Sequence, residues 1–213
     1  MNNIVKNFQN IRSSINNSNV NIIAVSKTFT LDKIKPLIDF GHNHFGENKV
    51  QEAKDKWLNI RQNNPNLQLH MIGKLQTNKA KDAVQLFDYI HSVDNEKLAS
   101  VIAKYENLLG KKNKYFIQVN VGNETQKSGI KIENLSDFYL FCRQISLNII
   151  GLMCIPPNNE ISKKYFLELF NLNKILKLDQ ISMGMSADYL DAIRCGSTFV
   201  RIGSAIFGDR MIK

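Results

Sequence analysis

The sequence has little cysteine, no cysteine pair at metal-binding spacing and no long apolar run. Its 213 residues include three cysteines, Cys142, Cys154 and Cys195, and no two of them form a CxxC motif. An odd count without that spacing argues against a disulfide framework or a zinc site, and fits a reducing compartment. No window reaches the roughly 18 consecutive apolar residues of a membrane-spanning helix. The sequence therefore predicts a cytoplasmic protein without a membrane segment, in which each cysteine is a small buried apolar side chain.

Two further absences narrow the class of protein. No GxGxxG motif follows the first predicted strand, which disfavours a dinucleotide-binding open sheet. The net charge is +9, but the lysines are scattered in ones and twos and are not interleaved with aromatic residues in a base-stacking pattern. Nucleic-acid binding, like a general phosphate-ligand barrel, therefore has only the charge in its favour, and we expect no nucleic-acid partner.

What is present is a regular alternation of strand and helix patterns. Apolar runs typical of strands occur at residues 22–25, 44–46, 67–72, 89–93, 115–121, 149–154, 181–183 and 198–202. Helical patterns lie between these runs, with Thr30, Thr77, Asp94 and Ser186 as predicted N-caps. Eight such units without a linker predict a single-domain α/β fold over residues 1–213, the (β/α)8 TIM barrel.

An additional helix is predicted at the N-terminus. Residues 1–17 place apolar side chains at helical spacing, including Ile4, Phe8 and Ile11. The segment lacks acidic residues, as transit peptides do, but it carries one arginine and a packed helix explains its apolar stripe. We expect this helix to cover the bottom of the barrel.

The candidate site begins with Lys27, which follows the first apolar run. Because side chains alternate along a strand, Ile23, Val25 and Lys27 share one face. A lysine at the carboxyl end of a barrel strand lies at the mouth, where the active sites of such barrels form. Burial there lowers the pKa of an amine, and a neutral amine is a nucleophile toward aldehydes. The alternative is a lysine that closes the strand and extends into solvent.

The last two predicted strands end in segments suited to a phosphate group. Ser186 follows the seventh run, and Gly203 and Ser204 follow the eighth, where barrels commonly bind phosphate. Arg201 lies on the eighth strand and needs an acceptor when buried. The structural alternatives are an N-cap for Ser186, a tight turn for Gly203 and a salt bridge for Arg201. Together with the lysine, these residues predict a phosphate ester that carries an aldehyde, either pyridoxal 5′-phosphate or a sugar phosphate in an aldolase-like barrel.

Seven motifs carry a resemblance to a known family over nearly the whole chain. They are AVSKT (24–28), FGENKVQE (45–52), HMIGKLQTNK (70–79), KSGI (127–130), GLMCIP (151–156), SMGMS (182–186) and VRIGSAIFG (200–208). With these motifs in this order, the chain resembles the YggS-like pyridoxal phosphate homeostasis proteins, which are barrels similar to the N-terminal domain of alanine racemase. Met71, Thr77 and Cys154 differ from the commoner residues at their positions, with no evident loss of chemistry.

The resemblance implies how pyridoxal 5′-phosphate is held. By it, Lys27 forms a Schiff base with the cofactor and Arg201 faces the pyridine nitrogen. The phosphate is held by Ser186, Gly203 and Ser204, Asn48 lines the pocket, and no residue takes a catalytic role. Because arginine stays protonated, it leaves the ring nitrogen unprotonated, and the ring is then a weaker electron sink.

The function implied by the resemblance is a monomeric carrier that buffers the cofactor or delivers it to recipient apoenzymes that depend on it. The alternative is an amino-acid racemase that uses the same cofactor. Alanine racemase takes a second base, a tyrosine, from its C-terminal domain, whereas this sequence ends at Lys213, shortly after the eighth run. We therefore expect no robust enzyme activity, although Tyr165 and Tyr189 are residues of the kind that could replace that base.

Three histidines have structural alternatives. His42 and His44 alternate on a predicted strand, but no third metal ligand lies nearby in the sequence, so we expect no metal site. His70 lies near the end of the third run. It either lines the mouth or is a hydrogen-bonded structural residue.

Overall fold

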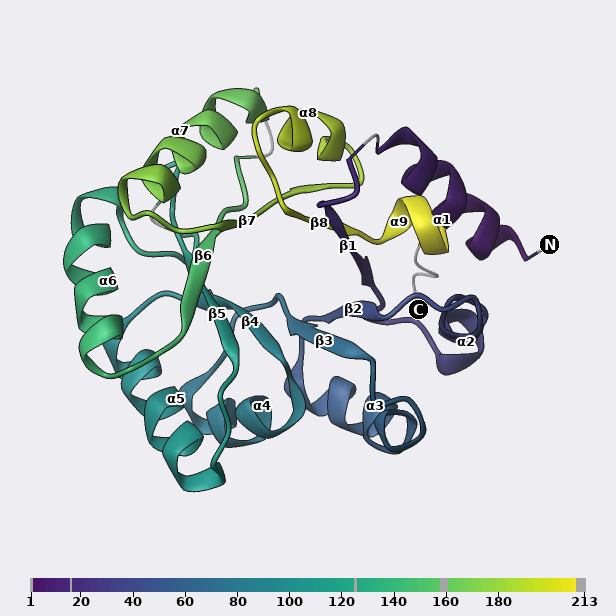
Figure 1. Cartoon of the computed structure of the whole chain (residues 1–213), viewed down its shortest axis with the longest axis horizontal. Helices are drawn as coiled ribbons and strands as arrows, with labels where there is room; N and C mark the ends of the chain where they lie inside the picture. Colours follow the sequence, from purple (N-terminus) through teal and green to yellow (C-terminus); the bar gives the residue numbers. More distant parts are fainter. Residues whose placement is uncertain (1, 16, 125, 158–160, 210–213) are drawn as a thin grey trace.

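The chain folds into a closed barrel of eight parallel strands surrounded by helices (Figure 1). This computed structural model describes residues 2–15, 17–124, 126–157 and 161–209. The strands are β1 (Asn21–Val25), β2 (His44–Glu47), β3 (Gln68–Met71), β4 (Tyr89–Val93), β5 (Lys114–Gln118), β6 (Ile149–Met153), β7 (Gln180–Met185) and β8 (Phe199–Ile202). Each strand pairs with the next in sequence, and β8 pairs with β1 to close the barrel. The predicted (β/α)8 fold is confirmed.

The helices form the outer layer. They are α1 (Asn3–Ser14), α2 (Leu31–Asp39), α3 (Val50–Asn63), α4 (Ala80–Leu86), α5 (Glu96–Leu109), α6 (Leu135–Gln144), α7 (Ser162–Ile175), α8 (Tyr189–Arg194) and α9 (Ser204–Phe207), with 3-10 turns η1 (Thr77–Lys79) and η2 (Ile132–Asn134). Within the described residues, no helix combines the length and the apolar composition that crossing a membrane requires. The predicted helices are present, and the parts of them expected at residues 1, 16 and 160 lie outside the described residues.

Helix α1 lies in the outer layer beside α9 and α2, and the expectation that it covers the bottom of the barrel is wrong (Figure 1). Its Phe8 ring packs on His42, with 4.5 Å between ring centroids. Its Asn7 amide donates to the Ile206 carbonyl of α9 at 3.1 Å. Helices α8 and α9 have only 6 and 4 residues, so they offer little apolar surface on that side, and the apolar face of α1 adds to it.

Several predicted helix caps differ in detail. Asn95, and not the neighbouring Asp94, caps α5 through its side chain. Thr77 opens the turn η1 before α4 begins, and Thr30 occupies the N-cap position of α2 without a side-chain cap bond. Neighbouring polar residues compete for a cap, so the sequence indicates a helix start only to within a few residues.

The barrel interior is filled by side chains from alternate strand positions. Ile23 packs inside the barrel with Phe116, Met153 and Phe199, whereas Ile22 belongs to the layer between strands and helices. This confirms that Ile22 and Ile23 lie on opposite faces of β1, as the alternation predicts, and that the face of Ile23 is the inner one.

A row of hydrogen-bonded polar side chains also crosses the interior, and we call it the histidine chain. His44 Nδ1 lies 2.9 Å from His70 Nε2, and His70 Nδ1 lies 3.0 Å from His91 Nε2. His91 Nδ1 lies 2.9 Å from Ser182 Oγ, which also accepts from Arg201 Nη1 at 2.8 Å. His70 is fully buried, so the structural alternative for this residue is confirmed.

Acid should destabilise the fold through the buried histidines. Burial is the main reason that the pKa values of His70 and His91 lie well below the ordinary 6.5. Both rings stay neutral in the folded chain and gain protons on unfolding, so their contribution is complete above that value and is lost as the pH falls below it. When the pH is lowered from about 7.5 to about 5.5, each neutral ring should reduce the free energy of unfolding by roughly 1 kcal/mol.

Urea unfolding of the wild type and of His91→Phe at both pH values measures this effect. The variant should lose roughly 1 kcal/mol less than the wild type over this interval, because it takes up one proton fewer on unfolding. Buried Glu47, whose pKa is raised, titrates in the opposite sense and is common to both proteins. An identical pH dependence in the two proteins would show that His91 takes up as many protons in the folded state as in the unfolded state, which contradicts a neutral buried ring.

Candidate cofactor-binding site

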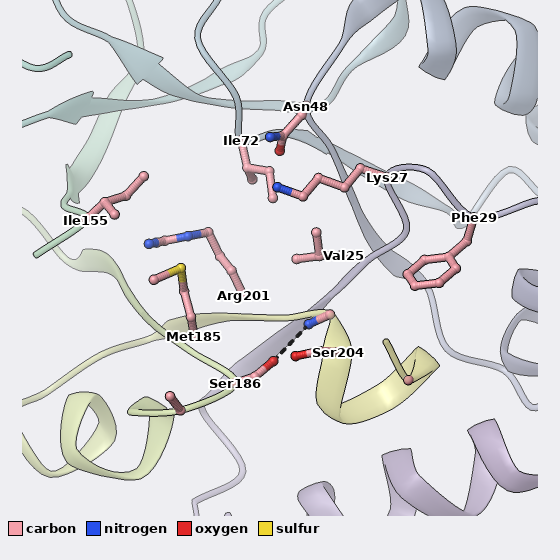
Figure 2. Close-up of a pocket in the computed structure, with 13 residues that line it drawn as sticks. Val25, Lys27, Phe29, Asn48, Ile72, Ile155, Met185, Ser186, Arg201 and Ser204 are labelled. Atoms are coloured by element: carbon pink, nitrogen blue, oxygen red, sulfur yellow. Dashed lines mark hydrogen bonds between the residues drawn. The ribbon is translucent and has the colours of Figure 1, made fainter. Parts of the chain in front are cut away.

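A cavity of about 340 Å³ opens at the mouth of the barrel, beside the carboxyl ends of the strands. All six residues predicted for the site line this cavity; they are Lys27, Asn48, Ser186, Arg201, Gly203 and Ser204. Most of the other lining residues are apolar (Figure 2), and they are Val25, Phe29, Ile72, Ile155, Met185, Ala187 and Gly208. The structure therefore brings the predicted residues together in one place.

Lys27 lies in a turn just past the end of β1, and its side chain extends into the cavity toward Asn48 (Figure 2). The next residue, Thr28, has φ of 68°, in the left-handed region that β-branched residues rarely adopt. Such a conformation costs about 1–3 kcal/mol and persists only where the surroundings enforce it. The direction of Lys27 is thus set by contacts that hold this turn.

The first of these contacts come from Glu47, the fully buried last residue of β2. Its Oε1 accepts from Ser26 Oγ at 2.7 Å, from Lys56 Nζ at 2.9 Å and from Trp57 Nε1 at 2.9 Å. Burial raises the pKa of Glu47, while the nearby Lys56 charge and these hydrogen bonds lower it. The carboxylate therefore ties the residue before Lys27 to helix α3.

Lys56 and Glu52 complete the support of the turn. Lys56 Nζ donates to the Ser26 carbonyl at 2.9 Å and to Glu52 Oε1 at 3.1 Å. The same Glu52 oxygen accepts from the backbone N–H of Thr28. These contacts explain how the strained turn persists. Sequence reasoning gave these residues no role, although the four-residue spacing of Glu52 and Lys56 is a helical ion-pair signal.

Ser186 joins two loops at the edge of the cavity. Its Oγ accepts from the Gly203 N–H at 3.3 Å and from the Ala205 N–H at 3.4 Å (Figure 2 shows the first). Helix α8 begins at Tyr189 with Asp188 at its N-cap, so the prediction that Ser186 caps this helix is wrong. Its hydroxyl and the amides of Gly203 and Ala205 meet at this edge of the cavity, and backbone amides of this kind bind phosphate oxygens.

Glycines shape this edge and the wall opposite. Gly184 has φ of +89°, and a Cβ there would come within 2.5 Å of the Ala192 side chain. A Cβ on Gly73 would come within 2.4 Å of the Asn48 carbonyl oxygen. Both positions therefore require glycine. Gly203 has an ordinary φ of −116°, so the absence of a side chain there leaves the amide approachable and serves no special turn.

Arg201 forms part of the cavity wall and is only 4% exposed. Its Nη1 donates to Ser182 Oγ at 2.8 Å and its Nη2 donates to the Cys154 carbonyl at 2.9 Å. These partners are neutral oxygens, so the salt-bridge alternative is not what the structure shows. Burial lowers the pKa of Arg201, but a guanidinium remains protonated in proteins. The wall thus carries a positive charge that its hydrogen-bond partners do not cancel; the Asp188 carboxylate, which is not one of these partners, acts on the charge and raises the pKa.

Other residues considered from the sequence lie away from the cavity. Tyr189 Oη is 3.0 Å from Ser14 Oγ, Tyr165 is buried on α7, and neither lines the cavity. Across the described part of the chain, no three His, Cys, Asp or Glu side chains converge as metal ligands. His42 Nε2 is 2.8 Å from the carbonyl of His44. The three cysteines are buried free thiols, as predicted.

The chain is similar to proteins of one family over nearly its whole length. The family model described as the N-terminal domain of alanine racemase matches residues 1–211. The pyridoxal phosphate homeostasis protein of Vibrio cholerae is 39% identical over 91% of this chain and 86% of its own length. The protein of the same name from Escherichia coli K12 is 33% identical over 99% of this chain and 98% of its own length.

Solved structures agree. PipY of Synechococcus elongatus, solved with pyridoxal phosphate bound, has a TM-score of 0.89 at 33% identity and covers 96% of this chain and 100% of its own. Alanine racemase of Clostridium difficile has a TM-score of 0.76 at 18% identity, which shows a common fold alone. The match covers 97% of this chain but 56% of that enzyme.

Removing the Lys56 amine should destabilise the protein strongly. Lys56→Met leaves the buried Glu47 carboxylate without its counter-charge, which should cost about 3 kcal/mol of unfolding free energy in urea titrations. Adding Glu47→Gln should recover much of that loss, because no charge is then buried. Lys54→Met is the matched control, since Lys54 lies on the same helix and pairs with Asp82 at the surface; it should cost below about 1 kcal/mol. Equal losses in the two lysine variants would contradict the role given to Lys56.

Proposed function

We propose a function that starts from the family: the chain belongs to the pyridoxal phosphate homeostasis proteins of the alanine racemase N-terminal domain family. In this proposal, the cavity holds pyridoxal 5′-phosphate as a Schiff base on Lys27. The observation that carries the proposal is the convergence of an amine, a set of amide and hydroxyl groups and a guanidinium on one cavity. The cofactor bound by PipY supports it. The cofactor in this role supplies an aldehyde that an amine can attack and a ring that withdraws electrons.

The residues present fit this group chemically. The Gly203 and Ala205 amides donate to the Ser186 hydroxyl in hydrogen bonds longer than 3.2 Å, so phosphate oxygens can replace this weak acceptor at little cost. Arg201 offers a cation whose hydrogen-bond partners are neutral, and Lys27 reaches into the same space. Apolar side chains such as Val25 and Ile155 supply surface for a ring. Asn48 adds a polar group at the rim.

Arg201 and the cavity wall favour holding the cofactor over catalysing a reaction with it. A guanidinium opposite the ring nitrogen keeps that nitrogen unprotonated, which weakens the ring as an electron sink and disfavours transaminase chemistry. Alanine racemases tolerate the same arrangement, so the case against racemisation rests on the second base. Racemisation needs an acid and a base on opposite faces of the substrate. Apart from Lys27 and Arg201, the described residues that line the cavity carry no ionisable side chain, and Tyr165 and Tyr189 lie elsewhere.

The cellular role that follows is a reservoir that buffers pyridoxal 5′-phosphate and delivers it to recipient apoenzymes. The open mouth of the cavity supports exchange of the cofactor. We further propose that the protein acts as a monomer in the cytoplasm without robust enzyme activity and without a nucleic-acid partner. The buried free thiols support a reducing compartment.

Substitution of Lys27 tests the proposal directly. Wild type incubated with pyridoxal 5′-phosphate should turn yellow, and borohydride should attach the phosphopyridoxyl group to the tryptic peptide that contains Lys27. Lys27→Ala should lose both signals, whereas Lys49→Ala, which alters an exposed lysine beside the cavity-lining Asn48, should keep them. Attachment of the label mainly to another lysine would contradict the assignment.

The same preparations test the alternative function. With L-alanine as the substrate, the wild type and Lys27→Ala should both form D-alanine at the same low rate as free pyridoxal 5′-phosphate. Turnover that is robust in the wild type and absent in Lys27→Ala would favour the racemase.

Ser186→Ala should weaken binding of the phosphate selectively. Loss of one hydrogen bond to a charged group costs about 1.5 kcal/mol, which corresponds to about a tenfold rise in the dissociation constant. Titrations followed by absorbance should show that rise for pyridoxal 5′-phosphate and less than a twofold change for pyridoxal, which lacks the phosphate. Equal losses for both ligands would place the phosphate away from Ser186.

A further inference from the structure

Arg201 faces the cavity at the end of the histidine chain, and its orientation depends on a side chain that can rotate. One of its two partners is the backbone carbonyl of Cys154. The N–H of the same residue donates to the backbone carbonyl of Ser182 at 3.3 Å, which fixes this partner in the sheet. The other partner, Ser182 Oγ, is a hydroxyl that accepts from Arg201 only while its own hydrogen points elsewhere. What holds that hydrogen therefore decides how Arg201 lies.

The hydrogen-bond partners of Ser182 give the row a single direction. Arg201 can only donate, so the Ser182 hydroxyl hydrogen goes to its other partner, His91 Nδ1 at 2.9 Å. His91 then carries its hydrogen on Nε2 and donates to His70 Nδ1 at 3.0 Å. His70 likewise donates from Nε2 to His44 Nδ1 at 2.9 Å. In the reverse direction, the described hydrogen bonds would leave the Ser182 hydrogen without an acceptor.

Packing holds the rings of this row in place. The His91 ring stacks on Phe116, with centroids 4.2 Å apart and planes 20° apart, and the His70 ring stacks on Tyr89 at 4.3 Å and 13°. Both histidines are fully buried. The row takes residues from β2, β3, β4, β7 and β8, so strands on opposite sides of the barrel interior are joined through it. Buried polar networks with every member satisfied define a single arrangement.

We propose that Ser182 and His91 are positioning residues that orient Arg201 toward the cofactor ring, with His70 and His44 holding His91 in the required tautomer. The ring-facing role of Arg201 rests on the proposed function. The hydrogen-bond direction of the row does not, and it is present before any ligand binds. Orientation in advance saves the cost of ordering a long side chain on binding, a cost of about 0.5–1.5 kcal/mol.

Three substitutions separate this role from simple core packing. Ser182→Ala removes the acceptor of Arg201. In His91→Asn the side-chain oxygen takes the place of Nδ1 and keeps the acceptor for Ser182, whereas in His91→Gln the amide group takes the place of Nε2. Ser197→Ala is the matched control, because Ser197 is a buried serine whose hydroxyl donates only to backbone carbonyls, the shortest bond being 2.8 Å to Met183.

The readouts are the dissociation constant and the absorption maximum of bound pyridoxal 5′-phosphate, with the melting temperature as the measure of damage to the core. Ser182→Ala and His91→Gln should weaken binding by about tenfold, equal to about 1.4 kcal/mol, and shift the absorption maximum. In His91→Asn and Ser197→Ala the dissociation constant should stay within threefold of the wild-type value and the absorption maximum should not shift. This should hold even where their melting temperatures fall as far as those of Ser182→Ala and His91→Gln. Equal losses in His91→Asn and His91→Gln, or wild-type binding by Ser182→Ala, would overturn the inference.

The direction of the row is measured without the cofactor. In protein labelled with ¹⁵N-histidine, long-range ¹H–¹⁵N spectra should show His91 and His70 as neutral rings with hydrogen on Nε2. Hydrogen on His91 Nδ1 would overturn the inference, whether or not the cofactor binds. If the wild type bound no cofactor at Lys27 while the tautomers were as expected, the proposed function alone would fail.

Discussion

The site depends on the parallel pairing of β1 with β8, which closes the barrel. The register pairs Ile23 with Arg201 and Ala24 with Ile202, so segments from the two ends of the sequence leave the sheet side by side. Lys27 follows one of these strands, and Gly203 and Ser204 follow the other. Without this pairing the Lys27 amine and the backbone amides that follow β8 would not share a cavity. Closure of the sheet is therefore the step that creates the binding site, as well as the step that removes its exposed edges.

Two buried polar networks then fix the groups that closure brings together. One joins Glu47 and Lys56 to the turn that carries Lys27, and the other joins Arg201 to the histidine chain. Glu47, Lys56 and the histidines do not line the cavity. The two residues that the networks support, Lys27 and Arg201, line it and have long side chains. Long side chains lose much conformational entropy on binding, so holding them beforehand favours a ligand of fixed shape. The strained backbone of Thr28 belongs to the same arrangement.

The fold and five of the six cavity residues could be predicted from the sequence because they follow from local patterns, whereas Asn48 was implied only by the family resemblance. Alternating apolar runs and capped helices predict the barrel, and the rule that barrel sites form where strands end brings Lys27, Ser186 and Arg201 together. The networks escaped prediction because they depend on register. His91 contacts Ser182, which lies 91 positions away in the sequence. This contact depends on which inward-facing side chains lie at the same level along the barrel axis. The placement of α1 likewise depends on the shortness of α8 and α9. Ser186 does not cap α8 as predicted, because its hydroxyl accepts hydrogen bonds from amides of another loop.

The central claim is that one amine, on Lys27, holds the cofactor while groups after β7 and β8 hold its phosphate. A crystal structure of the protein grown with pyridoxal 5′-phosphate measures this most directly. The account predicts continuous electron density from Lys27 Nζ to the ligand, with the phosphate at residues 186 and 203–205 and the ring nitrogen toward Arg201. Density for the ligand at any other lysine, or a Lys27 side chain directed away from those loops, would contradict it.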